Sequence, residues 1–326
     1  MSTQRNKVLV VTSKEDAHAD HIIALCNSRG WGERVIRLNT EDFVDNCQVS
    51  FDGRSFHLLI KDSGRSLRSD EIRAVWYRRP KDFELSEDDP YIRDYIIKQS
   101  TACLRGLYFC CHDTAIWINP LPALHRSRNK LQQLQVAYEV GLNPPRTIVT
   151  NSWQEAVAFC SAVEKVCTKS LDEPNFVLDG HIYPLLTRVI EKREVLENRE
   201  SIERCPVLFQ EYIEKMFDIR VVVMGEDIFA FEIHSQEHEL SKYDFRGVAP
   251  ELLAHVPHEL PADVKQGIRR FMQRQGLIFS AFDFVLSKDG KYYFLENNPN
   301  GQWLWLELLT GVPLSESMLK LLFGNP

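Results

Sequence analysis

The amino-acid sequence predicts an α/β fold made of three lobes. Its 326 residues exceed the usual size of a single domain. Short runs of β-branched residues alternate with stretches of helical periodicity, the pattern of strands joined by helices. Two prolines within residues 119–122 interrupt that pattern, and strands alternate with polar turns from residue 207 onward. We therefore expect lobes over residues 1–118, 119–205 and 206–326.

The composition is that of an ordinary folded protein, and it excludes several classes. Hydrophobic residues make up 44% and charged residues 26% of the chain, so no long disordered tract is expected. The net charge of −7 argues against a basic surface for nucleic acid. The eight cysteines form no C-x-x-C pair, so we expect neither a zinc site nor disulfides, and a cytoplasmic location. No apolar run has the length of a membrane span, so no membrane partner is expected.

The first lobe is expected to open with a buried strand and a helix, followed by a second strand and a hairpin that turns at Gly53. Pro80 then stops a further strand, and a long helix closes the lobe. Cys110 and Cys111 lie beside apolar residues near the end of that helix, so we interpret them as core residues and not as nucleophiles or metal ligands. The expected elements are residues 7–12, around 21–25, 35–39, 49–52, 55–60, 74–80 and 91–108.

The second lobe is expected to begin with a helix that Ser127 caps and Gly141 ends. A strand, a helix and another strand follow it. In the third lobe a buried strand leads into a hinge, the next strand begins at Asp218, and one long helix precedes the last hairpin. The expected elements after the first helix are residues 146–150, 152–163, 165–170, 207–213, 218–220 and 261–275.

The chain carries neither a Gly-rich Lys-Ser/Thr phosphate loop nor a paired-glycine dinucleotide motif. A hairpin over residues 281–299 offers another design for binding a nucleotide. Two apolar runs flank Asp289-Gly290, which predicts a two-residue type I′ turn with Lys288 facing Lys291. In that register Asp283 lies opposite Glu296, and Asn298 shares their face.

Three oxygen donors would then converge on one face of this hairpin. Mg²⁺ bound with phosphates takes hard oxygen ligands and few protein groups, and Asp283, Glu296 and Asn298 match that need. The alternative is a solvated acidic face on an ordinary hairpin. Aromatic residues around the carboxylates favour the metal site.

The segment D-F-x(10)-L-E-N-N-P-N-G, residues 283–301, resembles the magnesium site of the ATP-grasp superfamily. Its continuation through Gln302-Trp303-Leu304-Trp305 is similar to that of the microviridin-type maturases. These enzymes build graspetides, ribosomally made peptides cross-linked by side-chain esters or amides. Residues 75–80 (V-W-Y-R-R-P) and 127–134 (S-R-N-K-L-Q-Q-L) agree with this family, whereas Asn297 stands where it usually has an apolar residue. The resemblance implies an ATP-grasp fold with an N-terminal pre-ATP-grasp domain over residues 1–118.

The resemblance also implies roles for individual residues. Lys130 and Lys169 would contact the nucleotide phosphates, although each could instead be a solvated surface lysine. The hinge residues would cradle adenine and ribose, or else belong to a plain core strand. Arg220 and Arg246 would stabilise charge during phosphoryl transfer, or form structural salt bridges with Asp218. The implied nucleotide-binding set is Lys130, Lys169, Glu211, Tyr212, Ile213 and Asp218.

The function implied is that of an ATP- and Mg²⁺-dependent ligase acting on a leader-bearing precursor peptide. It would convert Asp or Glu side chains to acyl-phosphates, which Ser, Thr or Lys side chains of the same peptide then displace. Whether esters or amides form stays open, because the substrate supplies the nucleophile. Alternatives are an ATP-grasp ligase that adds glutamate or another amino acid, and a nucleotide-binding regulator without catalysis. A homodimer is implied by the resemblance alone, and we expect the first lobe and residues 171–204 to bind the leader.

Overall fold

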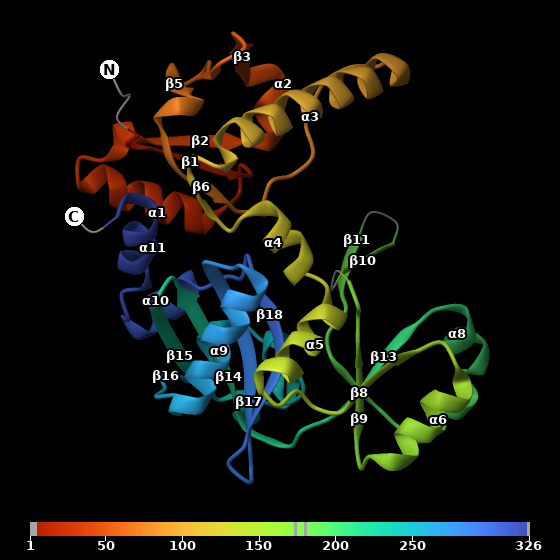
Figure 1. Ribbon diagram of the computed structural model, residues 1–326. Coiled ribbons are helices and arrows are strands. Elements are labelled where there is room, and N and C mark those ends of the chain that lie inside the picture. The colour runs from red at the N-terminus through yellow and green to blue at the C-terminus, as the bar shows by residue number, and fades with distance from the viewer. Residues whose placement is uncertain (1–4, 173–174, 179–180, 325–326) are drawn as a thin grey trace. The chain divides into compact units, whose positions relative to one another are not determined.

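The computed structural model describes residues 5–172, 175–178 and 181–324 (Figure 1). The chain divides into two compact units. The first combines the chain up to Leu121 with the C-terminal residues from Pro313, and the second runs from Pro122 to Val312. The expected lobe borders at residues 118/119 and 205/206 stay predictions.

The first unit is built on a parallel sheet with the strand order β2-β1-β6-β7. Val8, Leu9, Val10 and Val11 on β1 are fully buried, as expected for a parallel strand covered on both faces. A separate antiparallel sheet, β3-β4-β5, completes the unit's strands. The strands are β1 (Lys7–Thr12), β2 (Val35–Asn39), β3 (Cys47–Phe51), β4 (Phe56–Ile60), β5 (Arg65–Arg68), β6 (Ile72–Tyr77) and β7 (Ile116–Ile118).

Helices in this unit begin at clear sequence signals. The side chain of Asp16 accepts from the first amides of α1, and Asp89 does the same for α3, which has Pro90 at its first position. The buried residues of α3, among them Leu104 and Leu107, all lie in its second half, while its first half is largely exposed and extends beyond β3 (Figure 1). The helices are α1 (Ala17–Ser28), α2 (Phe43–Asn46), α3 (Pro90–His112) and α11 (Leu314–Phe323).

The second unit contains two larger antiparallel sheets, ordered β12-β9-β13-β8 and β16-β15-β14-β17-β18. A further pair of strands, β10 and β11, forms a hairpin. The first sheet comprises β8 (Thr147–Thr150), β9 (Val166–Lys169), β12 (Arg188–Ile190) and β13 (Val207–Glu211), and the hairpin β10 (Asn175–Leu178) and β11 (His181–Pro184). The second sheet comprises β14 (Lys215–Met224), β15 (Asp227–Ile233), β16 (His255–Pro257), β17 (Phe279–Ser287) and β18 (Tyr292–Asn298).

Helices α5 and α9 pack with the five-stranded sheet in one core, in which Phe271, Phe282, Phe284 and Phe294 touch one another. Such aromatic contacts add to the free energy gained from burying apolar area. Helix α6 packs with the four-stranded sheet in a smaller core. The helices are α4 (Leu121–Ser127), α5 (Lys130–Val140), α6 (Trp153–Ala162), α7 (Lys192–Glu197), α8 (Arg199–Arg204), α9 (Ala262–Gln275) and α10 (Leu304–Thr310).

The expected start of α5 is wrong by two residues. Ser127 ends the short helix α4, and Asn129 caps α5 by accepting from the amide of Gln132 at 3.1 Å. Asparagine is as good an N-cap as serine, and Lys130 therefore becomes the first residue of the helix. The end at Gly141 is confirmed, with φ +80° at that glycine.

The hairpin of β17 and β18 has the expected pairing at its carboxylates but a different turn. The carbonyl of Ser287 accepts a hydrogen bond from the amide of Gly290, and the amide of Ser287 donates to the carbonyl of Lys291. Ser287 therefore faces Lys291 across a three-residue loop, and the expected facing pair of Lys288 with Lys291 is wrong. A β-bulge between Asp283 and Phe284 then restores the expected pairing of Asp283 with Glu296.

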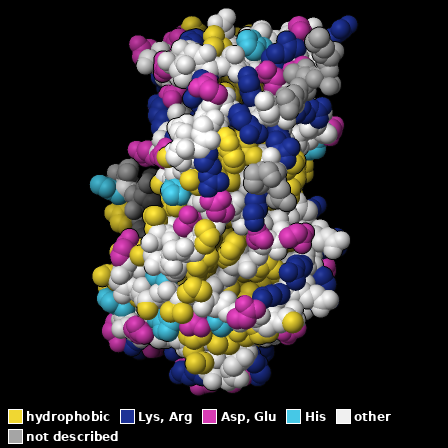
Figure 2. Space-filling model, turned by 90° about the vertical axis from the view of Figure 1, so that its left-hand side faces the viewer, with side chains coloured by type: hydrophobic (Ala, Val, Ile, Leu, Met, Phe, Trp, Pro, Cys, Tyr) yellow, Lys and Arg dark blue, Asp and Glu magenta, His cyan; other side chains and the backbone are white. Residues whose placement is uncertain are grey.

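Acidic and basic side chains are intermixed on the face drawn in Figure 2. None of the helices in the described part of the chain combines the length and apolarity needed to cross a bilayer.

Candidate active site

The structure brings the three expected oxygen donors together on neighbouring strands. Asp283 on β17 pairs with Glu296 on β18, and Asn298 lies two residues further along β18. The Asn298 amide Nδ2 lies 3.1 Å from Asp283 Oδ2 and 3.5 Å from Glu296 Oε1. The side chains of Asp283 and Glu296 are 13% and 18% exposed, so both can be reached from solvent while most of their surface is covered.

Arg220 is the direct partner of Asp283. It lies on β14, whose register with β17 places the two residues opposite each other. Arg220 Nη1 donates to both carboxylate oxygens of Asp283, at 2.7 and 2.9 Å, and Nη2 donates to the carbonyl of Gln302 at 3.0 Å. Two charge-assisted hydrogen bonds to one carboxylate fix the guanidinium beside the proposed metal ligands.

Both expected lysines approach β18 from other elements of the second unit. Lys130, at the start of α5, lies 3.9 Å from Glu296 Oε2 and donates to the carbonyl of Ser170. Lys169, at the end of β9, donates to the carbonyl of Leu295 at 3.4 Å. Neither is a freely solvated surface lysine, so that alternative is wrong, while a role for them at the nucleotide phosphates stays a prediction.

The two carboxylates differ in their electrostatics. Burial raises the pKa of Asp283, and the charge of Arg220 offsets that rise only in part. Burial acts in the same direction on Glu296, but Lys169, Lys130 and Arg246 together hold the pKa of Glu296 below its usual value. The cationic side chains therefore surround Glu296 from more than one element, which is the arrangement needed to receive an anionic ligand.

Arg246 lies in a short 3-10 helix, Phe245–Gly247, in the connection between β15 and β16. Its guanidinium donates to both oxygens of Asp244, at 2.8 and 2.6 Å, while the amide of Thr187 donates to Asp244 at 3.2 Å. Its side chain stays 43% exposed. The bidentate bond to Asp244 orients Arg246 while leaving part of the guanidinium open to a ligand.

Asp218 has a different environment from the one expected. Lys215 donates to both of its carboxylate oxygens, at 2.8 and 2.7 Å, and Ser235 Oγ donates to it as well. The salt bridge considered for Asp218, with Arg220 or Arg246, is thus wrong: its partner is Lys215, and those two arginines pair with Asp283 and Asp244. A nucleotide-binding role for Asp218 remains a prediction.

The hinge after β13 is held by backbone hydrogen bonds to neighbouring segments, and its adenine-binding role stays a prediction. The amides of Glu211 and Tyr212 donate to the carbonyls of Arg146 and Lys165, both at 2.8 Å. Tyr212 also stacks edge-on against Tyr243, with ring centroids 5.6 Å apart. Ile213 is half-buried beside them.

Comparison with known proteins shows the family to which the chain belongs. A family model described as the MvdD pre-ATP grasp domain matches residues 7–125. The macrocyclase MdnB from Microcystis aeruginosa MRC is 30% identical over 98% of this chain and 100% of its own, with a TM-score of 0.78.

The chain belongs to the family of ATP-grasp peptide maturases that includes MdnB.

Two other solved members agree over nearly the whole length. An ATP-grasp ligase from Chryseobacterium gregarium, in complex with ADP and a leader and core peptide, is 29% identical over 97% of this chain and 96% of its own, with a TM-score of 0.87. MdnC from Microcystis aeruginosa MRC, bound with precursor peptide MdnA, is 26% identical over 98% and 100%, with a TM-score of 0.82. A comparison with curated proteins finds no match.

The donors of this ATP-grasp maturase fit a magnesium ion bound with nucleotide. Among the described residues no group of three or more His, Cys, Asp or Glu could hold a metal, so a site here needs Asn298 and ligand oxygens beside its two carboxylates. Turning the Asn298 amide would present its oxygen in place of Nδ2, because both atoms end the same planar group. Mg²⁺ keeps waters and phosphate oxygens as ligands, so few protein donors suffice.

Sequence reasoning missed Gly301, which this arrangement requires. A Cβ atom at that position would lie 2.4 Å from Ala281 Cβ and 2.8 Å from Arg220 Nη2. Only glycine therefore lets the N-P-N-G segment pass so close to the guanidinium. The motif itself contained the signal, because its glycine comes shortly after β18, the strand expected to carry two of the metal ligands.

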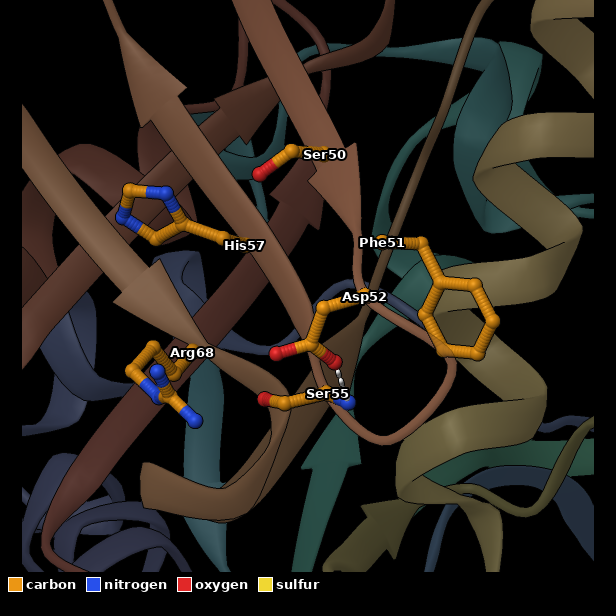
Figure 3. A pocket seen from close by; sticks show the side chains of 6 residues that line it. All are labelled: Ser50, Phe51, Asp52, Ser55, His57 and Arg68. Carbon is orange, nitrogen blue, oxygen red and sulfur yellow. Dashed lines mark hydrogen bonds between the residues drawn. The ribbon is translucent and has the colours of Figure 1, made fainter.

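The cavity described in the structure lies elsewhere. It measures about 250 Å³ and is lined by residues of β3, β4 and β5 and the turns beside them, including Phe51, His57 and Arg68 (Figure 3). Arg68 already pairs with Asp70, with Nε 3.1 Å from Oδ1. None of the predicted site residues lines this cavity, and it offers no set of groups for nucleotide phosphates.

Proposed function

We propose that this protein is an ADP-forming ATP-grasp ligase that cross-links Asp or Glu side chains of a ribosomal precursor peptide to Ser, Thr or Lys side chains of the same peptide. The observation that carries the proposal is the convergence of Asp283, Glu296 and Asn298 with Arg220 and the two lysines. It is supported by family membership over nearly the whole chain.

The nucleotide would lie between the hinge and the hairpin of β17 and β18. Two hinge amides are engaged by protein carbonyls, whereas the amide of Ile213 donates to none of the described residues, so it is the donor we assign to adenine. Lys130 and Lys169 would hold the phosphates. Asp283, Glu296 and Asn298 would hold Mg²⁺, which supplies charge neutralisation at the phosphate oxygens.

The reaction balances through an acyl-phosphate. A carboxylate oxygen of the peptide attacks the γ-phosphorus, and the bond to ADP breaks. A hydroxyl or amine of the same peptide then attacks the acyl carbon, phosphate leaves with the bonding electrons, and the nucleophile loses its proton. For each bond formed, the peptide loses one water and ATP becomes ADP and phosphate.

The arginines would act on the charge that moves during these steps. Arg220 is held rigidly by Asp283 and the Gln302 carbonyl, so its guanidinium needs little reorganisation to meet an anion. Arg246 is oriented by Asp244 and is more exposed. We assign both to stabilising the phosphoryl group and the acyl-phosphate.

The proposed partner is a leader-bearing precursor peptide; the C. gregarium ligase is in complex with a leader and core peptide, and MdnC is bound with a precursor peptide. Leader binding was expected at the first lobe and residues 171–204, of which residues 173–174 and 179–180 lie outside the described residues. A reducing cytoplasm is the location we propose, because the eight cysteines are free.

We also propose a homodimer formed by α3. Tyr91, Tyr95 and Phe109 are 85%, 64% and 75% exposed, and their spacing places them on one side of the helix, opposite buried Leu107. A second copy running antiparallel brings Tyr91 of one helix beside Phe109 of the other and Asp94 beside Arg105. That pairing covers the aromatic side chains and matches opposite charges.

Product mass tests the proposed reaction. With a matched precursor, ATP and Mg²⁺, we expect successive losses of one water from the leader-bearing peptide, ADP as coproduct, and a hydroxamate when hydroxylamine is added. The core peptide alone should react much more slowly, because leader binding raises its effective concentration at the site. A gain of mass on the peptide would instead identify an amino-acid ligase, and AMP as coproduct would contradict the acyl-phosphate.

A further inference from the structure

One glutamine of α5 binds the backbone of the metal-binding strand from outside the sheet. Gln133 Nε2 donates to the carbonyl of Asn297 at 2.9 Å, and the amide of Asn297 donates to Gln133 Oε1, also at 2.9 Å. The same Nε2 donates to the carbonyl of Ser127 at 2.8 Å. Gln133 is only 3% exposed, so these bonds lie in a site from which solvent is largely excluded.

Gln133 makes the hydrogen bonds to Asn297 that a further strand beside β18 would make. In the five-stranded sheet β18 is the last strand, and among the described strands it pairs only with β17. Asn297 turns both of its backbone polar groups toward the open edge, where a neighbouring strand would normally satisfy them. The planar carboxamide of Gln133 supplies one donor and one acceptor, as the backbone of a neighbouring strand would.

The residue held in this way lies between two proposed metal ligands, Glu296 and Asn298. The side chain of Asn297 is held as well, because its Nδ2 donates to Ser280 Oγ on β17 at 2.9 Å. Lys130, one turn before Gln133 on α5, approaches Glu296 itself. One helical turn of α5 therefore sets the position of a phosphate-binding lysine and of the strand that carries two ligands.

We propose that Gln133 is a positioning residue that holds Glu296 and Asn298 in place for Mg²⁺ and nucleotide. This inference rests on the proposed function of the hairpin. Gln133 itself would touch neither the nucleotide nor the metal. It acts by keeping the edge of β18 from fraying, so its loss weakens the metal-dependent part of nucleotide binding.

The test compares two substitutions on one helix. Gln133→Met keeps the length of the side chain but removes both bonds to Asn297. Gln135→Met is the matched control, because Gln135 is exposed and its amide reaches only Glu139, at 3.1 Å. Circular dichroism and the melting temperature establish that each variant folds.

Two readouts are independent of turnover. Hydrogen exchange of the peptide spanning β18 should show a protected Asn297 amide in the wild type and in Gln135→Met, and exchange about tenfold faster or more in Gln133→Met, since a lost buried bond of this kind shifts an equilibrium by about that factor. Calorimetric titration with ADP should show that Gln133→Met needs about tenfold more Mg²⁺ for half-maximal binding. Its affinity for ADP without Mg²⁺ should match that of the wild type.

The outcomes separate this inference from the proposed function. If ADP binding by the wild type does not depend on Mg²⁺, the metal site itself fails. If it does depend on Mg²⁺ but Gln133→Met behaves like Gln135→Met in both readouts, the positioning role is overturned. A wild-type Asn297 amide that exchanges as fast as those of exposed loops would also overturn it, even if Gln133→Met does not fold.

Discussion

Gly301 shows how one residue without a side chain determines the position of another. Its backbone passes Arg220 so closely that a methyl group would meet the guanidinium and Ala281. The guanidinium of Arg220 cannot move aside without breaking its hydrogen bonds to Asp283 and to the Gln302 carbonyl. The catalytic assignment of Arg220 therefore depends on a position that carries no chemistry itself.

We predict that Gly301→Ala lowers turnover by about tenfold or more and also lowers the melting temperature, because overpacking a buried site costs about 1–3 kcal/mol. The double variant Gly301→Ala with Ala281→Gly removes the contact of 2.4 Å but leaves the one of 2.8 Å with Arg220. It should regain melting temperature without regaining turnover, as measured by ADP release. Recovery of both together would show that Arg220 was never displaced.

The roles of single residues were only partly predictable from the sequence. The donors Asp283, Glu296 and Asn298 could be placed on one face because strand periodicity fixes which side chains share a side. The partner of Asp218 could not, because a break in the β14 register between Lys215 and Phe217 brings the Lys215 ammonium onto the same carboxylate. Irregularities of this kind leave no pattern in the residue types.

At the scale of elements, the pairing of Asp283 with Glu296 in the last hairpin was predicted correctly, but the turn that was expected to produce it was wrong. The expected two-residue turn would give one constant register, whereas the structure has a three-residue loop followed by a bulge, and the two shifts cancel. Gly290, with φ +78°, sits where such a loop needs a left-handed residue. Asp-Gly is compatible with both turns, so the sequence alone did not distinguish them.

The boundaries of helices follow the same lesson. Asp89-Pro90 is a strong local signal for the start of a helix, and α3 starts there. Gly141 is a strong local signal for the end of a helix, and α5 ends there. Around α4 and α5 two capping residues, Ser127 and Asn129, stand close together, and tertiary packing decides between them. Ser127 is fully buried and donates to the carbonyl of Ala123, so it is not available as a cap.

The exposed side of α3 carries a prediction at the same scale. We expect the wild type to be a dimer by light scattering after size-exclusion chromatography, and Phe109→Glu to be a monomer, because two carboxylates would be buried against aromatic rings. The control is Leu308→Glu on α10, which is similarly exposed at 69% and should stay dimeric. A wild-type monomer, or a dimer that survives Phe109→Glu, would contradict the α3 interface.

At the scale of the whole molecule, stability at low pH depends on charges buried in the first unit. Arg78, 1% exposed, donates to both oxygens of Asp16, at 3.1 and 3.3 Å. Burial acts to raise the pKa of Asp16, but Arg78 overcomes it and lowers that pKa to about 2. His18, in the first turn of α1, lies beside this pair. Burial, with the added repulsion of Arg78, lowers the pKa of His18 to about 3.

These shifts fix the sign of the pH dependence. Between about pH 6.5 and 3 an unfolded chain binds a proton at His18 that the folded chain refuses, so the free energy of unfolding falls as pH falls, by about 1.4 kcal/mol per unit for this group. Asp16 adds a second loss only below about pH 4, as it is protonated in the unfolded chain before the folded one. Neutral pH is therefore the stable side for both groups.

We predict that His18→Gln removes the first of these losses. The substitution replaces a titrating ring with a neutral polar side chain, whereas every other group titrates as before. The difference in unfolding free energy between wild type and variant should therefore shift by about 2 kcal/mol in favour of the variant between pH 6.5 and 5. Hydrogen exchange of the β1 amides at each pH measures this difference within the first unit, where other parts of the chain do not contribute. A difference that is constant with pH would mean that His18 is protonated equally in both states, and Arg78 would then not be the charge that keeps the imidazole neutral.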